Sequence, residues 1–391
     1  MEPSILLQRY FLPLLYLVNI LGLAARPSIC RTLMTLPIIV LLLLQLPLRQ
    51  DRGNFGDDYS SGCTALTLAF TYLDWIVLAN PDKEKWHKIR DRRNAKGKQD
   101  RNIAVPSSFV QRLWWAARLM IYVRGTGWSH QSKNVPEGHP ANYPKLKFAV
   151  RKTFRAVFFF FVQDTACAYT ASTPYGTYRG IEKTPVGFLS APFMTQFLLC
   201  WVHITITYSL LELINCVVGV ISVLSGLAPP NECPRLFGDL RGAYTVRRSW
   251  SATWHQMMRR VCSMSGIFLA RDVFHLAKGT FASKYLQLFV GFLASGIIHS
   301  GASAANARSF VDNGEISFFL AQAVIILIED HIIEFGRKLG ARDSWIWRIL
   351  GYLWIITWFG YSLRPWVSGG ASKGIWVHRR SVDIFGIGPQ D

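Results

Sequence analysis

Long apolar blocks alternate with polar segments along the whole chain. Each block is about as long as the roughly 20-residue helix that crosses about 30 Å of hydrocarbon. The blocks are too long and too uniformly apolar for barrel strands, so helices are predicted. They lie near residues 4–24, 31–48, 62–80, 147–170, 191–226, 282–303, 314–335 and 344–364. We therefore predict an all-α polytopic membrane protein with about eight transmembrane helices, forming one domain over residues 1–391.

The polar segments between the blocks predict the orientation of the chain. A basic loop at about 81–146 opens with a dense run of Lys and Arg, and the positive-inside rule places it in the cytoplasm. The acidic segment 51–60 then falls on the lumenal side. If 191–226 crosses the membrane once, Arg247 and Arg248 also lie in the cytoplasm, so one long helix is favoured over two short ones.

Composition supports a membrane protein and argues against nucleic-acid binding. The chain is 50% hydrophobic and 17% charged, whereas soluble chains carry about a quarter charged residues. Most of the basic residues behind its net charge of +19 lie in segments between apolar blocks, which is typical of loops that face anionic lipid. The seven cysteines form no CxxC pair. Neither a disulfide framework nor a metal site is therefore predicted.

The segment RRSWSATWHQMMRR, residues 247–260, predicts an amphipathic interfacial helix. Over residues 247–261, one face of that helix carries Arg248, His255 and Arg259, and the opposite face carries Trp250, Trp254, Met257 and Val261. Tryptophans suit the headgroup boundary, so a membrane-surface anchor is one interpretation. A histidine between two arginines indicates a site instead, because the cations would hold it neutral and able to accept a proton. Arginine forks also suit the phosphates of a nucleotide-type cofactor.

A second candidate lies in FVGFLASGIIHSGASAAN, residues 289–306, where His299 falls within an apolar helix. An ionisable residue there predicts a functional site. Its helical neighbours are all small: Ser295, Gly296, Ala302 and Ser303. They could leave a groove for substrate, or they could allow close helix packing. A neutral histidine in a dry groove suits acyl transfer from a thioester to an alcohol, which needs a general base and no enzyme nucleophile.

Together these segments resemble a known family. The run PRLFGDLRGAYTVRRSWSATWHQMMRR (234–260), followed by SGIIHS (295–300), is similar to the wax-synthase-like branch of the membrane-bound O-acyltransferases. That branch has a Pro-x-Leu-Phe-Gly stretch, a Trp-x-x-x-Trp-His-Gln-x-x-Arg motif and a later intramembrane histidine. The matching positions are Pro234, Leu236, Phe237, Gly238, Trp250, Trp254, His255, Gln256, Arg259 and His299. RGTGW (124–128) resembles an Arg-Gly-x-Gly-Trp element of the fungal members. The resemblance covers most of the chain.

The resemblance implies roles for individual residues in the motif region 229–303. His299 is implied as the catalytic base. His255 is the second catalytic candidate, and it stands where sterol and diacylglycerol acyltransferases have an asparagine. The expected binding residues for acyl-CoA and acceptor are Trp250, Trp254, Gln256, Arg248, Arg259 and Ser295.

The resemblance also implies the substrates and location of the protein. The fungal members are mostly acetyltransferases of terpenoid, meroterpenoid or trichothecene-type pathways. Acetyl-CoA is therefore the expected co-substrate, a hydrophobic alcohol the acceptor, and the endoplasmic reticulum the expected membrane, with no bound cofactor. A wax-ester or sterol acyltransferase is the alternative within the family.

Two other interpretations fit the sequence less well. A transporter would use His299 and Asp330 in a polar pathway, but mid-membrane charges are few: Asp164, Glu212, Glu329 and Asp330 are the main ones. HKIRD (87–91) and DIFGIG (383–388) echo motifs of soluble plant-type acyltransferases. We interpret both as chance, because those enzymes are soluble two-domain proteins.

Overall fold

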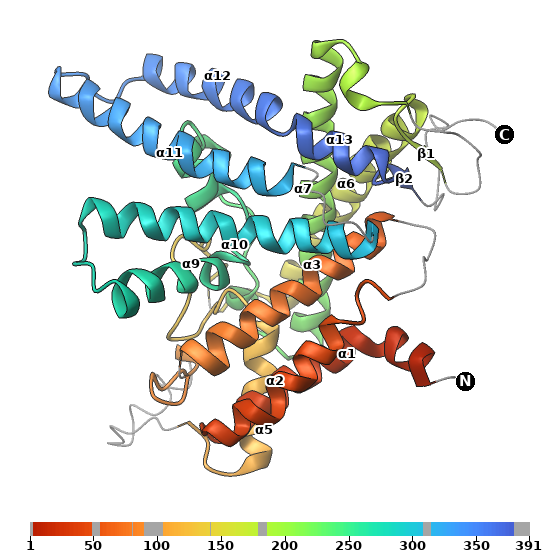
Figure 1. Cartoon of the computed structure of the whole chain (residues 1–391), viewed down its shortest axis with the longest axis vertical. Helices are drawn as coiled ribbons and strands as arrows, with labels where there is room; N and C mark the ends of the chain where they lie inside the picture. The colour runs from red at the N-terminus through yellow and green to blue at the C-terminus, as the bar shows by residue number, and fades with distance from the viewer. Residues whose placement is uncertain are drawn as a thin grey trace. The chain divides into compact units, whose positions relative to one another are not determined.

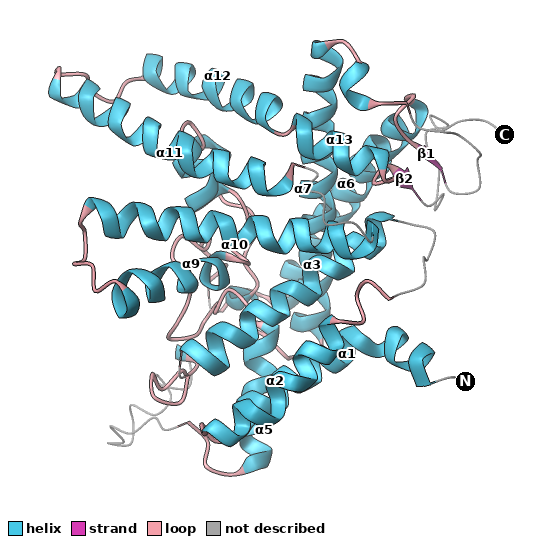
Figure 2. Ribbon diagram, in the orientation of Figure 1, coloured by secondary structure: helices cyan, strands magenta, loops and turns pink. Residues whose placement is uncertain are grey.

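The fold is that of an all-α protein, as predicted, and every apolar block forms a helix (Figure 2). The computed structural model describes residues 3–48, 55–79, 81–89, 105–140, 142–178, 186–307 and 314–378. The helices of the eight blocks are α1 (Pro3–Ala24), α2 (Ile29–Leu43), α3 (Phe55–Tyr72), α6 (Lys145–Ser172), α7 (Phe193–Leu224), α10 (Phe281–Ala307), α11 (Glu315–Lys338) and α12 (Trp345–Ser362). The long block at 191–226 is one helix, α7, which confirms that prediction.

Not every block has the length and composition of a membrane span. Among the described residues, four helical stretches are long and apolar enough to cross a bilayer: Phe55–Leu78, Phe193–Leu224, Phe281–Asn306 and Glu315–Lys338. The apolar stretches in α1 and α2 are shorter, at Tyr10–Ala24 and Ile29–Leu43. Helix α6 carries Arg151, Lys152 and Arg155 in its N-terminal half. Eight crossings therefore stay a prediction.

The chain divides into two compact units that are each assembled from separate segments. Unit 1 comprises residues 1–50, 59–133 and 257–310, and unit 2 comprises residues 51–58, 134–256 and 311–391. The motif region 229–303 is divided between them after Gln256. His299 therefore belongs to unit 1 and His255 to unit 2.

Unit 1 is built on two groups of packed helices (Figure 1). Helix α1 packs against α2 and α5 (Phe109–Ile121), and α9 (Arg259–Phe268) packs against α10. A short π-helix, η1 (Leu73–Leu78), continues α3, and another, η6 (Leu269–Val273), follows α9. The largest fully buried side chains of unit 1 include Trp75, Trp86 and Trp128.

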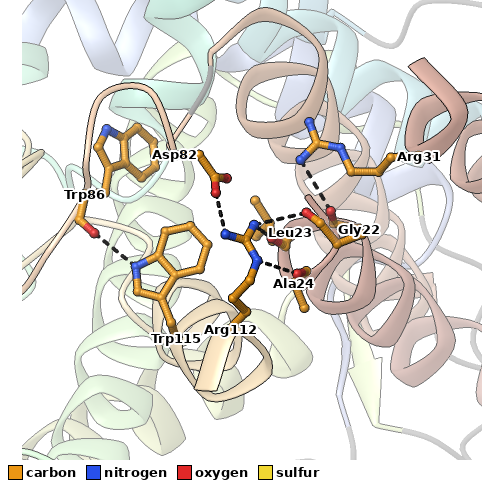
Figure 3. Close-up of polar contacts among 9 residues, drawn as sticks. Gly22, Leu23, Ala24, Arg31, Asp82, Trp86, Arg112 and Trp115 are labelled. Carbon is orange, nitrogen blue, oxygen red and sulfur yellow. Dashed lines mark hydrogen bonds and ion pairs between the residues drawn. The ribbon is translucent and has the colours of Figure 1, made fainter. Parts of the chain in front are cut away.

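The C-terminal end of α1 is held by Arg112, a buried side chain of α5 (Figure 3). The last carbonyls of a helix have no intrahelical partner and carry partial negative charge. Arg112 donates to the carbonyls of Ala24 at 2.6 Å, Ala25 at 3.0 Å and Leu23 at 3.1 Å. It also forms an ion pair with Asp82. One guanidinium therefore fixes the α1 end to α5.

Unit 2 is built on the long pair α6 and α7, which pack along each other. Helices α12 and α13 (Arg364–Ser372) pack against α7, and α11 packs against α13. Two short strands, β1 (Thr177–Tyr178) and β2 (Val377–His378), pair in parallel with Thr177 opposite Val377. The irregular segment between α7 and unit 1 holds η3 (Pro230–Glu232), η4 (Leu240–Gly242), α8 (Val246–Arg248) and the π-helix η5 (Ser249–Thr253).

Candidate active site

His299 lies on α10 and is paired with side chains of α3. The Oη atom of Tyr59 is 2.8 Å from His299 Nδ1, and the Sγ atom of Cys63 is 3.5 Å from the same nitrogen. The Tyr59 and imidazole rings are stacked with their centroids 6.1 Å apart. Tyr59 and Cys63 are one helical turn apart, so both contact the imidazole from the same face of α3. The half-buried His299 is thus oriented through one of its two ring nitrogens.

Small residues let α3 and α10 approach closely beside this histidine. A Cβ atom on Gly62 would lie 2.9 Å from the Cβ of Ala302, and one on Gly301 would lie 2.8 Å from Leu66 Cδ1. Ala302 and Ser303 are buried, with 0% and 1% exposure. Close packing, rather than an open groove, therefore occupies this side of α10, as expected of small residues at helix contacts.

Ser295, the predicted binding residue on α10, lies against α9. Its side chain forms a hydrogen bond with Cys262. Burial raises the pKa of the Cys262 thiol to about 12, so this cysteine is not a thiolate at neutral pH. Ser295 therefore contributes to the α9–α10 contact.

The prediction of one amphipathic helix over 247–261 is wrong. Helical backbone ends at Thr253, and Trp254 is extended, with φ −66° and ψ 152°. Helix α9 then begins anew at Arg259. The side-chain amide of Gln256 donates to the carbonyls of Trp250 at 3.1 Å and Trp254 at 2.6 Å. These carbonyls would accept backbone bonds in a continued helix, so the buried Gln256 stabilises the break.

The tryptophans of the motif pack inside unit 2 instead of forming an interfacial face. The Trp250 ring lies among three phenylalanines, with centroid distances of 5.8 Å to Phe319, 5.9 Å to Phe359 and 6.3 Å to Phe318. Its indole N–H donates to Gln322 at 3.4 Å. Trp250 therefore anchors the segment to α11 and α12.

The four arginines of the motif have separate partners. Arg247 forms two hydrogen bonds of 2.7 Å with Asp330, and Arg248 is exposed and donates to the Tyr244 hydroxyl at 2.7 Å. In unit 1, Arg260 pairs with the buried Asp74 at 2.9 Å and lies over the Trp86 ring at 4.3 Å, while Arg259 donates to the Lys133 carbonyl at 3.4 Å. Arg247 and Arg260 therefore form ion pairs within the protein.

Two acidic residues that the sequence places among the few charges of the apolar helices bind the motif segment. Glu212 of α7 accepts the backbone N–H groups of Leu236 and Phe237. Glu329 of α11 accepts those of Val246 and Arg247. Sequence reasoning noticed these carboxylates as rare charges in apolar helices and missed their backbone partners.

RGTGW and the described residues 87–89 of HKIRD pair in unit 1. Gly125 and Gly127 have positive φ values of 64° and 76°, which favour glycine, and Trp128 is buried. The Gly127 carbonyl accepts the Ile89 N–H at 2.9 Å, and the His87 carbonyl accepts the Ser129 N–H at 2.9 Å. A turn conformation therefore accounts for the glycine pattern. Asp91 and the DIFGIG segment lie outside the described residues.

Comparisons with known proteins agree with the resemblance noted in the sequence. The model of the membrane bound O-acyl transferase family matches residues 233–321. Acetyltransferase sirH of Leptosphaeria maculans is 41% identical over 97% of this chain and 95% of its own length. Acetyltransferase ple2 of Rhodocybe pseudopiperita is 30% identical over 92% of this chain and 90% of its own, and acetyltransferase eriL of Hericium erinaceus is 29% identical over 91% and 88%. No solved structure gives a significant match.

Proposed function

We propose that this chain, which belongs to the membrane bound O-acyl transferase family and is therefore an O-acyltransferase, acetylates a hydrophobic alcohol. The donor is acetyl-CoA, and the acceptor is a secondary metabolite of terpenoid or meroterpenoid type. Three similar proteins are named acetyltransferases and match this chain over most of its length, which supports the acetyl donor. The proposed location is the endoplasmic reticulum membrane.

In the proposed reaction His299 is the general base, and its contact with Tyr59 is the observation that carries the proposal. If Nδ1–H donates to Tyr59 Oη over the 2.8 Å contact, Nε2 carries the lone pair and takes the proton of the acceptor hydroxyl in this reaction. The alcohol oxygen then attacks the thioester carbonyl carbon, and the C–S bond breaks. The departing CoA thiolate takes the proton back from the imidazolium, so histidine is regenerated.

The motif segment is proposed to bind the acyl-CoA and the acceptor. Arg248 is exposed and suits the phosphate groups of CoA. Ser295 and Arg259 are proposed as further binding residues. His255 is proposed to orient a substrate, while Trp250, Trp254 and Gln256 keep the segment in shape through the contacts described above.

The test measures transfer in membranes that contain the protein. Labelled acetyl-CoA is supplied with a panel of terpenoid alcohols, and a parallel arm supplies long-chain acyl-CoA with fatty alcohols and sterols. We expect labelled ester only with acetyl-CoA and a terpenoid-type alcohol, and no ester from a His299→Ala variant present at equal amount. Ester formation only in the parallel arm would establish a wax-ester or sterol acyltransferase and overturn the acetyl assignment.

A further inference from the structure

Two buried carboxylates of unit 2 reach the same segment, residues 234–256, from apolar helices. Glu212 of α7 is fully buried, and its Oε1 accepts the N–H of Leu236 at 3.2 Å and that of Phe237 at 3.3 Å. Glu329 of α11, which is 8% exposed, accepts two N–H groups at the start of α8, Val246 at 2.8 Å and Arg247 at 3.1 Å. The start and the middle of the segment are therefore held by side chains of α7 and α11.

A buried carboxylate in an apolar helix is unfavourable unless it has partners. Burying a charged group costs several kcal/mol unless other groups compensate it. Here the compensation comes from motif backbone and from nearby arginines: Arg155 lies 3.3 Å from Glu212, and Arg247 binds Asp330 beside Glu329. An apolar side chain would pack there without that cost. The presence of the two carboxylates is therefore explained by the backbone N–H groups that they bind.

The contacts made by Glu212 lead to His255 through Phe237. The Phe237 ring is stacked on Tyr208 of α7 at 4.0 Å. It lies edge-on to Trp254 at 5.1 Å and to His255 at 5.8 Å. The backbone position of Phe237 therefore sets the position of its ring, which contacts His255.

Gly238, the residue after Phe237, joins this part of the motif to the residues just before His255. The N–H of Gly238 donates to the Thr253 carbonyl at 2.8 Å, and a Cβ at this position would lie 2.1 Å from the Ala252 carbonyl oxygen. Only glycine allows the two backbone segments to approach this closely. The Leu-Phe-Gly part of the motif and the residues just before His255 therefore form one unit, which Glu212 ties to α7.

We propose that Glu212 and Glu329 are positioning residues that set the conformation of segment 234–256 through its backbone N–H groups. Glu212 acts on His255 through Phe237, and Glu329 fixes the start of α8 ahead of Trp250. The proposal rests on the proposed function in that the segment is taken to carry substrate-binding residues. Neither glutamate touches substrate.

The test compares an acceptor-removing and an acceptor-keeping substitution at each glutamate. Glu212→Leu and Glu329→Leu remove the hydrogen-bond acceptors. Glu212→Gln keeps a carbonyl oxygen for both N–H groups, because one oxygen of Glu212 accepts the two. Glu329→Gln keeps an acceptor for only one, because the two oxygens of Glu329 accept one N–H each. Glu315→Gln is the matched control, because Glu315 is a buried carboxylate at the other end of α11. Amide hydrogen exchange of the purified proteins reports the segment directly, without reference to activity.

We expect Glu212→Leu to raise exchange at residues 236–237 and Glu329→Leu at 246–247. Glu212→Gln and the control should stay near wild type, and Glu329→Gln should raise exchange at 246–247 less than Glu329→Leu does. In transfer assays, Glu212→Leu should lower kcat about 10- to 100-fold with little change in KM, since a misplaced group mainly costs the chemical step. Phe237→Ala leaves the Glu212 contacts in place and should lower kcat similarly.

A double substitution separates positioning from general damage. If Glu212 acts through His255, Glu212→Leu should cost less than about 3-fold further in a His255→Ala background. Unchanged exchange at 236–237 in the Leu variant, or full multiplication of the two losses, would overturn the proposal. Absence of transfer by the wild type would instead overturn the proposed function, and the exchange data would still decide whether the glutamates hold the segment.

Discussion

His299 and His255 are held in place by different means. His299 sits in the middle of a continuous helix, and close packing of α10 against α3 sets its position. His255 sits on an irregular segment between η5 and α9, which side-chain bonds to the backbone keep in shape. The first arrangement relies on close approach of two helices at small residues, and the second on a few hydrogen bonds to carboxylates and an amide.

This difference predicts which kind of substitution disturbs each histidine. Helix packing is sensitive to added volume, because interiors have little free space. A hydrogen-bonded loop is sensitive to loss of a single acceptor, because the buried N–H groups it leaves behind cost free energy. The two histidines should therefore respond to different kinds of substitution, and the predictions below are arranged by the expected effect on transfer.

Replacing His299 with alanine should have the largest effect. General-base catalysis contributes about 10²- to 10⁴-fold, so we expect kcat to fall about 10³-fold with acetyl-CoA binding unchanged. Steady-state kinetics and a binding measurement on the same membranes check this. Equal loss of binding and turnover would mean that the side chain is structural.

Replacing His255 with alanine should lower transfer about 10- to 100-fold without abolishing it, because a residue that orients substrate contributes less than the base. The measurement is kcat and KM for each substrate. If the kinetics were unchanged, the segment 247–260 would be only a structural connection between the units.

Gly62→Val should lower activity about 10-fold and also lower the thermal stability of the protein. The added side chain would collide with Ala302, whose Cβ would be 2.9 Å from the first added carbon, and overpacking typically costs about 1–3 kcal/mol. Gly187→Ala is the control, because a Cβ there meets only Ser190 Oγ, at 3.8 Å. Equal melting temperatures for both variants and wild type would refute the close contact of α3 and α10.

Tyr59→Phe should lower kcat about 3- to 10-fold, since the imidazole keeps its packing but loses the hydrogen bond that orients Nδ1. Rate measurements against pH check this. No change at any pH would show that the 2.8 Å contact does not matter for turnover.

Replacing His130 with phenylalanine should change how the stability of the protein depends on pH, and it should leave transfer at neutral pH unchanged. Burial, with a further contribution from Arg260, lowers the pKa of His130 to about 3, and its ring is stacked on Trp86 at 3.9 Å. Between the ordinary histidine pKa of about 6.5 and 3, the unfolded chain binds more protons, so stability falls as pH falls, by up to about 1.4 kcal/mol per unit. In His130→Phe the loss of melting temperature from pH 7 to pH 5 should be smaller. An identical loss in both proteins would contradict this.

The helices could be predicted from the sequence, whereas the site contacts could not. Apolar blocks reveal α7 and α10 directly, and His299 stands out within one of them. Its partner Tyr59 is 240 residues away, and no local pattern links the two. The helical phase of 247–261 looked regular because periodicity takes no account of Gln256, which bonds the carbonyls of Trp250 and Trp254 and breaks the helix.

The most direct test of the account measures how the effect of His299→Ala depends on the acidity of the acceptor. A base is needed less as the hydroxyl becomes more acidic, so the ratio of wild-type to variant rate should fall steeply from an ordinary alcohol to a fluorinated analogue of the same alcohol. The account predicts a ratio of about 10³ for the alcohol and a much smaller one for the analogue. The same ratio for both acceptors, or full activity of the variant with the alcohol, would contradict the role of His299 as general base.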